Sequence, residues 1–136
     1  MDVYRVSTDA AEIDPATLHA ALVRLYACHA MPLRQLPAAL AHSLPFAALT
    51  EGGELAAFAR VITDQATFAH ITDAMVLEGH RGRGLSRLLL DAILAHPALA
   101  SVSTFSVASP GNGFFAQSGL PISTPAEPAG ELRRPV

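Results

Sequence analysis

Apolar and polar positions alternate along several stretches of the chain in the way that is typical of β-strands. Strands are predicted over residues 3–7, 44–50, 54–62, 66–77, 101–108 and 130–133. Gly52-Gly53 separates the second stretch from the third, and Thr63-Asp64-Gln65 separates the third from the fourth. Because both separators are short turns, these three strands are expected to form an antiparallel meander.

A different period marks the helices. Apolar residues recur at intervals of three and four at Leu85, Leu88, Leu89, Ala92 and Ile93. This period predicts an amphipathic helix over about residues 83–95, which ends near Pro97 and has an apolar face broad enough to pack on a sheet. Asp14 followed by Pro15 predicts the capped start of a helix over residues 16–30, and shorter helices are expected over 32–42 and 113–118.

The order of these elements predicts the topology of the second half. A helix between the strands 66–77 and 101–108 makes a crossover connection, which leaves the two strands parallel or nearly so. A crevice can open beside such a pair. With 136 residues the chain has room for one domain, residues 1–136, of mixed helix and strand.

Composition narrows the classes of function. The chain is 51% hydrophobic and 15% charged, without a run of the ~18 apolar residues that a membrane span needs. Residues 1–5 lack the basic and then apolar layout of a signal peptide, so a cytoplasmic protein with no membrane partner is expected. Nine Arg and no Lys against twelve acids give a net charge of -3, which argues against nucleic acid as a partner.

The metal-binding residue types give no pattern of their own. Cys28 is the only cysteine, so neither an internal disulfide nor a cysteine cluster for a metal can form. It follows the apolar run 22–27, which predicts a buried small hydrophobe rather than a nucleophile. The six His show no spacing typical of metal ligands, and no metal is expected.

The most informative stretch is residues 75–90, where a predicted strand ends in a Gly-rich turn that opens a helix. The first N-H groups of a helix have no partner within it, and they lie at the positive end of the helix dipole. This layout predicts an anion site, to which Arg81 and Arg83 add charge. A Walker loop is excluded because the chain has no Lys, and a dinucleotide fingerprint is disfavoured because Arg87 stands where its third Gly belongs.

Arg81-Gly82-Arg83-Gly84-Leu85-Ser86 resembles the Arg/Gln-x-x-Gly-x-Gly/Ala acetyl-CoA signature of the GNAT (N-acetyltransferase) superfamily. Residues 68–77 and 93–97 resemble the family's preceding strand and the end of its following helix, so the likeness covers about residues 54–120. It implies an α/β (α+β) fold, in which a mixed, mostly antiparallel central sheet carries helices on both faces and a splayed strand pair binds CoA. Relatives are often dimers, so the resemblance allows for a homodimer.

The same resemblance implies how acetyl-CoA, as acyl donor, would be bound. The pyrophosphate would lie on the loop and helix start, and the pantetheine arm along the strand before them. The residues implied for the cofactor are Met75, Val76, Leu77, Arg81, Gly82, Arg83, Gly84, Leu85, Ser86, Asn112 and Phe115.

Acetyl transfer to an amine also needs a group that takes up the amine's proton. The candidates near the expected crevice are Asp73, Glu78, His70 and His80. Asp73 is the first choice, since on a strand it shares a face with Met75 and Leu77. The alternative is an Asp that caps a turn or pairs with an Arg, and His80 is expected to be a solvated loop residue.

One position departs from the family pattern. The family usually offers a Tyr to the leaving thiolate, but Phe115 holds that position in Gly113-Phe114-Phe115-Ala116-Gln117-Ser118-Gly119-Leu120. The leading prediction is an acetyl-CoA-dependent N-acetyltransferase that moves acetyl to a primary amine of a small molecule or peptide by direct attack. The alternatives are a non-catalytic acyl-CoA sensor or interaction module, and a structural domain whose Gly-rich loop is only a tight turn.

Overall fold

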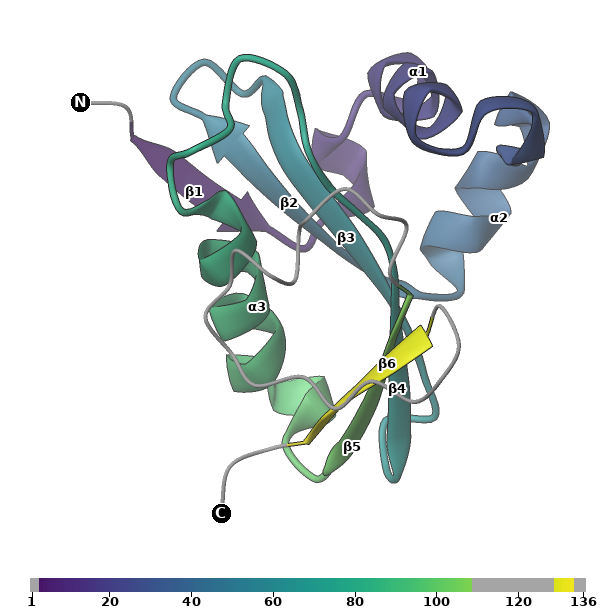
Figure 1. Ribbon diagram of the computed structural model, residues 1–136, viewed down its shortest axis with the longest axis vertical. Coiled ribbons are helices and arrows are strands. Elements are labelled where there is room, and N and C mark those ends of the chain that lie inside the picture. Colours follow the sequence, from purple (N-terminus) through teal and green to yellow (C-terminus); the bar gives the residue numbers. More distant parts are fainter. Residues whose placement is uncertain (1–2, 109–128, 134–136) are drawn as a thin grey trace.

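The computed structural model describes residues 3–108 and 129–133, with side chains described for residues 3–108. Its described strands form one sheet in sequence order, and every neighbouring pair is antiparallel except β4 and β5, which are parallel (Figure 1). The strands are β1 (Tyr4–Ser7), β2 (Leu44–Thr50), β3 (Leu55–Thr63), β4 (Phe68–Val76), β5 (Thr104–Ala108) and β6 (Ala129–Arg133). The predicted mixed, mostly antiparallel sheet is confirmed.

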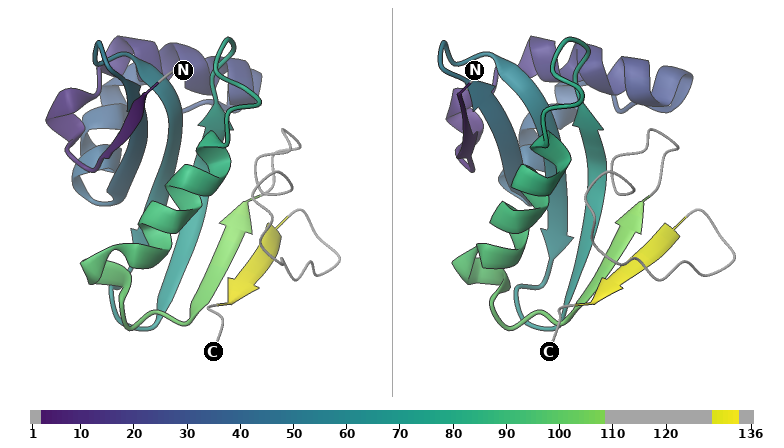
Figure 2. Two further views of the ribbon diagram at one scale, coloured as in Figure 1. Left: turned by 90° about the vertical axis from the view of Figure 1, so that its left-hand side faces the viewer. Right: turned by 60° about the vertical axis from the view of Figure 1, so that its left-hand side comes forward.

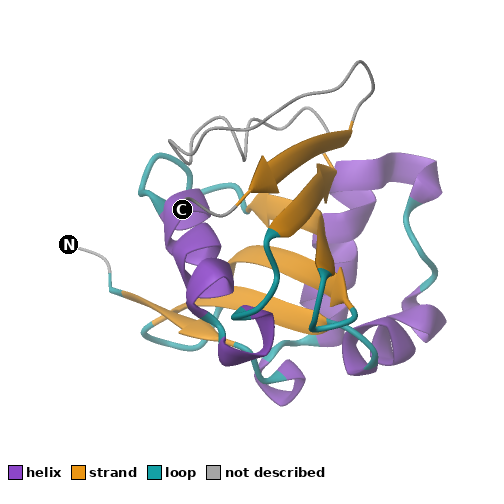
Figure 3. Ribbon diagram, turned by 90° about the horizontal axis from the view of Figure 1, so that it is seen from below, coloured by secondary structure: helices purple, strands orange, loops and turns teal. Residues whose placement is uncertain are grey.

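Helices cover both faces of this sheet, as Figures 2 and 3 show. Helix α3 (Leu85–Ala95) packs on one face of the sheet, where Leu85, Leu89, Leu90 and Ile93 join apolar strand residues in the larger core. On the other face α1 (Pro15–Tyr26) and α2 (Leu36–Ala41) form a second core with β2, β3 and β4. No helix in the described part of the chain is long and apolar enough to cross a membrane.

Strand β4 begins later than the predicted residue 66, because a turn comes before it. The Asp64 carboxylate accepts hydrogen bonds from the backbone N-H groups of Ala66, Thr67 and Phe68 and from the Thr67 hydroxyl. These hydrogen bonds hold the pKa of the Asp64 carboxyl well below its usual range, with the Thr67 hydroxyl as the main cause. Because Ala66 and Thr67 are used in the turn, β4 begins at Phe68.

A β-bulge interrupts β4 in its second half. Phe58 pairs with Met75 and Arg60 pairs with Thr72, so two residues of β4, Asp73 and Ala74, lie opposite one residue of β3. Asp73 has φ 57°, in the left-handed region. The extra residue reverses which side chains point to which face, because side chains alternate along a strand.

The prediction for the first helix was wrong at its end. Asp14 caps α1 as expected, accepting from the Thr17 N-H at 3.2 Å, but the helix ends at Tyr26 rather than at residue 30. Ala27 has φ 53°, which breaks the helical path, and a short 3-10 turn follows over Ala27–His29. Cys28 lies in this turn, outside the buried stripe of α1, and is exposed rather than buried.

The other boundaries agree more closely. The helix predicted over 32–42 is a 3-10 turn, Leu33–Gln35, followed by α2, and a further 3-10 turn, Pro97–Leu99, delays β5 to Thr104. The predicted strand over residues 130–133 corresponds to β6. The helix predicted over residues 113–118 lies outside the described residues.

The crossover from β4 through α3 to β5 is parallel, as predicted, but the two strands pair over only part of their length. Phe68 to Ile71 pair with Thr104 to Val107. Beyond Ile71, no strand in the described residues pairs with the β5 side of β4, whereas β3 still pairs with the opposite side up to Val76. We call this part of β4, which no described strand pairs on the β5 side, the open edge, and it leads toward the start of α3 (Figure 1).

Candidate active site

The loop between β4 and α3 ends in an open helix start. Gly84 is the N-cap of α3, with φ 74° and no side-chain cap, and the first turn of α3 has no acid. Apart from the chain neighbours, no atom of the described residues lies within 4 Å of the position that a Cβ would take at Gly82 or Gly84. The first helical bond runs from Leu88 N to Gly84 O at 3.0 Å, so the N-H groups before it point out of the helix. This geometry suits an anion.

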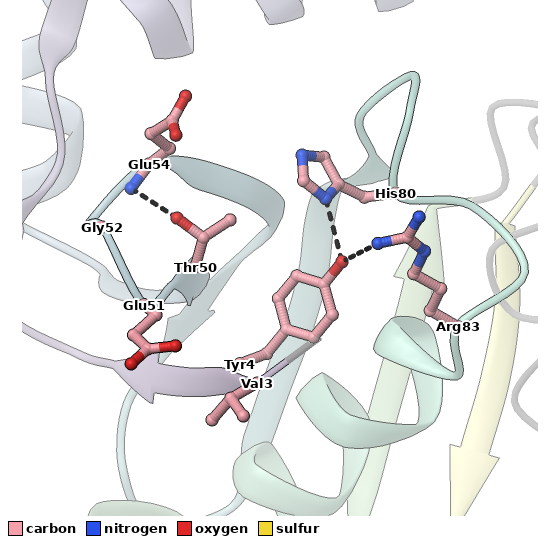
Figure 4. A pocket seen from close by; sticks show the side chains of 8 residues that line it. All are labelled: Val3, Tyr4, Thr50, Glu51, Gly52, Glu54, His80 and Arg83. Carbon is pink, nitrogen blue, oxygen red and sulfur yellow. Dashed lines mark hydrogen bonds between the residues drawn. The ribbon is translucent and has the colours of Figure 1, made fainter. Parts of the chain in front are cut away.

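The two Arg side chains of the loop take different directions. Arg81 is exposed, and its Nε donates to the Val76 carbonyl at 3.2 Å, which holds the loop against the end of β4. Arg83 extends to β1, where its Nη1 donates to the Tyr4 hydroxyl at 2.9 Å (Figure 4). A contact between Arg83 and a phosphate therefore stays a prediction.

His80 is not the solvated loop residue that the sequence suggested. It is half-buried, and its Nδ1 lies 2.9 Å from the Tyr4 hydroxyl (Figure 4). Its ring also meets the Tyr4 ring edge to face, with centroids 5.7 Å apart. The contact with an element 76 residues away is what removes His80 from solvent.

A hollow of about 270 Å³ lies beside these side chains, between β1, the β2–β3 turn and the loop (Figure 4). Its lining is Val3, Tyr4, Thr50, Glu51, Gly52, Glu54, His80 and Arg83. In the sheet, β1 to β3 lie on one side of β4 and β5 lies on the other. The hollow is therefore on the far side of β4 from its open edge, although His80 and Arg83 of the loop before α3 contribute to its lining.

Asp73 lies at the bulge of β4 and faces α1. It is only 5% exposed. Arg60 Nε donates to its Oδ2 at 2.8 Å, and the Tyr26 hydroxyl donates to its Oδ1 at 2.8 Å. As predicted, Asp73 shares a face with Met75 and Leu77, which belong to the core on the α1 side. The alternative in which it pairs with an Arg also holds, so both oxygens of Asp73 are already engaged.

Tyr26 completes this arrangement from the end of α1. The Tyr26 hydroxyl donates to the Asp73 carboxylate and accepts the backbone N-H of Asp73 at 3.1 Å. Burial, and next the neighbouring Asp73, raise the pKa of Tyr26 to about 12. Tyr26 therefore stays a neutral donor at physiological pH, and it ties α1 to the bulge.

His70 lies on the same face of the sheet as Asp73, three residues before it, and is near enough for the charges of Arg60 and Asp73 to act on it. It is half-buried, and its Nδ1 lies 3.2 Å from the Ser106 hydroxyl of β5. Burial, followed by the positive charge of Arg60, lowers the pKa of His70 below its ordinary 6.5. The imidazole is therefore neutral at pH 7 and can accept a proton. Glu78, the remaining candidate base, is exposed in the loop.

Comparison with known proteins decides the family. A profile of the Acetyltransferase (GNAT) family matches residues 12–108. The chain belongs to this family. A comparison with curated proteins gives no match. A GNAT-family protein of known structure from Xanthomonas campestris pv. campestris is 40% identical, with a TM-score of 0.78 over 93% of this chain and 88% of that one.

Two structures solved with CoA share the GNAT fold at low identity. A GNAT family N-acetyltransferase from Escherichia coli in complex with CoA is 15% identical, with a TM-score of 0.66 over 97% of this chain and 81% of that one. N-acetylglutamate synthase from Neisseria gonorrhoeae, complexed with coenzyme A and N-acetyl-glutamate, is 16% identical, with a TM-score of 0.71 over 96% of this chain and 35% of that one.

The described residues of this GNAT domain fit acyl-CoA. The open space at Gly82 and Gly84, together with the uncapped start of α3, suits a pyrophosphate. Met75 and Val76 end β4, and Leu77 begins the loop that leads to this helix start. The backbone of Leu77 is not open to a ligand, since its N-H donates to the Ala56 carbonyl and its carbonyl accepts from the His80 N-H. Asn112 and Phe115, the other residues implied for the cofactor, lie outside the described residues. In the described part of the chain no group of three or more His, Cys, Asp or Glu could hold a metal ion.

Sequence reasoning missed Arg60 and Tyr26. Arg60 carried a usable signal, because it is the only charged residue of β3, Leu-Ala-Ala-Phe-Ala-Arg-Val-Ile-Thr, and alternates with Phe58 on one face. Tyr26 had no comparable signal. Its role depends on where α1 ends and on the bulge of β4, neither of which a local pattern reveals.

Proposed function

We propose that this GNAT protein transfers acetyl from acetyl-CoA to a primary amine of a small molecule or peptide, by direct attack within a ternary complex. Family membership and the CoA-bound neighbours support acyl-CoA-dependent acetyl transfer in general. The observation that carries the proposal is the end of the described β4–β5 pairing at Ile71, beyond which β4 runs on through the Gly-rich loop to the uncapped start of α3. What we propose beyond acetyl transfer in general is that the acceptor is a primary amine.

In this proposal the pyrophosphate binds the N-H groups at Gly84, Leu85 and Ser86, with Arg81 beside it. The pantetheine amides pair with β4 at Met75 and Val76, as an added strand would. Leu77 is not part of this pairing, because its N-H already donates to the Ala56 carbonyl and its own carbonyl accepts from the His80 N-H. A backbone N-H there stabilises the negative charge that develops on the thioester oxygen. The β4 bulge supports this role, because it ends the regular register where the open edge begins.

The proposed reaction is the aminolysis of a thioester. The lone pair of a neutral amine attacks the thioester carbonyl, the C–N bond forms and the C–S bond breaks, and the thiolate leaves with the bonding pair. One amine proton passes to a base. Asp73 was the first choice from the sequence, but its oxygens already accept from Arg60 and Tyr26. We therefore propose His70 as the base, since its ring is neutral at pH 7 and Ser106 accompanies only one of its nitrogens.

The second candidate function is a non-catalytic acyl-CoA sensor. It is favoured by Phe115, which stands where the family usually has a Tyr. A general acid contributes about 10²–10⁴ in rate, but a thiol of pKa ~8.5 is already a fair leaving group, so Phe115 is compatible with slow transfer.

The two functions separate in one assay of CoA release from acetyl-CoA across a broad panel of primary amines. The enzyme predicts acceptor-dependent release of CoA, with N-acetyl product detected by mass spectrometry. Acetyl-CoA binding without release for any amine would support the sensor. Phe115→Tyr serves as the sensitised variant, and if thiolate departure limits the rate it should release CoA up to ~10²-fold faster.

A further inference from the structure

Arg60 of β3 has more donors than its described contacts use. Its Nε donates to Asp73 Oδ2 at 2.8 Å, and no other hydrogen bond to this guanidinium occurs within residues 3–108. The side chain is 13% exposed, and every fully buried side-chain N or O in the described residues has a partner. Nη1 and Nη2 of Arg60, which have no partner in the described chain, are therefore not fully buried.

The Asp73 contact fixes how this guanidinium is presented. Asp73 binds the Nε, and Tyr26 in turn fills the other carboxylate oxygen. The planar guanidinium of Arg60 is thus held at its Nε side, which leaves its two terminal nitrogens, Nη1 and Nη2, to face a ligand together. Two parallel N-H donors in this fork match two oxygens of a carboxylate or a phosphate. The flat carboxylate, with a single charge, is the smaller of the two and suits a side chain that is only 13% exposed.

Arg60 also lies beside the proposed reaction centre. Its backbone pairs with Thr72, the residue just before the bulge, and the open edge of β4 begins at the same level. Adjacent strands are about 4.8 Å apart, so a small acceptor bound over Arg60 would lie within a few bond lengths of that edge. We call the face of the sheet that carries Arg60 and His70 the acceptor face. His70 is close enough for the Arg60 charge to act on it.

We propose that the two terminal nitrogens of Arg60 bind a carboxylate of the acceptor, so that the acceptor is an amino acid or a similarly small amine that carries a carboxylate. This inference rests on the proposed function, whose acceptor it specifies. A carboxylate held at Arg60 places an amine a few bonds away near the open edge of β4. The same contact completes the hydrogen bonding of a guanidinium that is largely withdrawn from water.

The test compares each of a panel of L-amino acids with its own carboxamide, which differs only in the charged group. For the wild type, kcat/KM of the best acid should exceed that of its amide by about 10- to 100-fold, the worth of a charge-assisted hydrogen-bond pair. Arg60→Lys keeps a positive charge for Asp73 but loses the fork. It should therefore raise KM of the acid and make kcat/KM of the acid and of its amide nearly equal. The KM of acetyl-CoA should not change.

Arg5→Lys is the matched control, because Arg5 also pairs with a carboxylate, that of Glu12 at 2.7 Å, but on the exposed edge strand β1. It should keep the wild-type preference for acids. A wild type that uses amides as well as acids overturns the inference whether or not Arg60→Lys folds. So does an Arg60→Lys variant that folds and retains the preference.

A binding measurement keeps this inference separate from the proposed catalysis. The same acids and amides are added to the CoA-saturated wild type, and the thermal midpoint is followed. Selective stabilisation by acids, lost in Arg60→Lys, supports carboxylate recognition even if no CoA is released with any amine. Equal shifts with acids and amides contradict it even if turnover is observed.

Discussion

Asp73 shows how one residue can combine a special backbone conformation with a buried charge. Its φ of 57° lies in the left-handed region, which Asp and Asn tolerate better than other residues with a Cβ. Its carboxylate joins β4 to Arg60 of β3 and to Tyr26 of α1. The residue thus serves the bulge through its backbone and the contact between three elements through its side chain.

Asp73→Asn is expected to destabilise the fold by about 3 kcal/mol, because it keeps the backbone conformation but leaves Arg60 buried without its counter-charge. Urea unfolding at pH 7 measures this. Asp91→Asn is the control, since the Arg87–Asp91 pair is exposed and should contribute about 1 kcal/mol or less. An equal loss in the free energy of unfolding for the two variants would mean that the Arg60–Asp73 pair stabilises the fold no more than an exposed pair does.

His70→Gln is expected to lower kcat/KM by about 10²–10⁴ and to change its pH profile. The lowered pKa of His70 means that its neutral form is lost only as pH falls through a value below 6.5. Wild-type activity, corrected for the fraction of neutral amine, should therefore fall below that pH and be level above it. The His70→Gln profile should lack this acidic fall, and an unchanged profile would exclude His70 as the base.

At the scale of elements, the joint between β4 and α3 carries the cofactor proposal. Gly84 ends the loop and begins the helix in the left-handed region, at φ 74°. The helix start is uncapped and its first turn has no acid, so nothing on α3 itself competes with an anion there.

Gly84→Asp is expected to abolish measurable CoA binding while the fold is retained. Space for the side chain exists among the described residues, since none of their atoms beyond the chain neighbours lies within 4 Å of the added Cβ, but the carboxylate would stand where a phosphate approaches. Isothermal titration with CoA measures this. Gly53→Asp is the matched control, because Gly53 also has a positive φ, 88°, and open space at its Cβ but lies in the β2–β3 turn. Full CoA affinity in a folded Gly84→Asp variant would move the cofactor site elsewhere.

At the scale of the whole molecule, the two faces of the sheet have different tasks. The α3 face holds the larger core and leads to the cofactor loop, while α1 and α2 cover the opposite face (Figure 2). Arg60, His70 and Asp73 belong to that opposite face, where Tyr26 of α1 contacts Asp73. A donor on the open edge of β4 would thus lie between a rigid core and a polar acceptor face. CoA bound there should couple to the stability of the entire domain.

CoA at 100 times its dissociation constant is expected to stabilise the folded protein by about 2.7 kcal/mol, since a ligand that binds only the folded state shifts the unfolding equilibrium by mass action. A thermal melt with and without CoA measures the shift, and adenosine at the same concentration controls for non-specific effects. An unchanged midpoint over a wide range of CoA concentration would favour the structural domain without CoA affinity.

Local patterns in the sequence determined the strands, the amphipathic α3, the parallel crossover and the Gly-rich loop, because each depends on the chemistry of neighbouring residues. The GNAT family followed from the same loop. Tertiary structure alone decided the end of α1 at Tyr26, the exposure of Cys28, the bulge at Asp73 and the direction of Arg83 toward Tyr4. These features rest on contacts between residues far apart in the chain, such as Tyr26 and Asp73, which are 47 residues apart. A carboxylate becomes a partner of Arg60 rather than a free base only when the folded sheet brings the two together and excludes water from them.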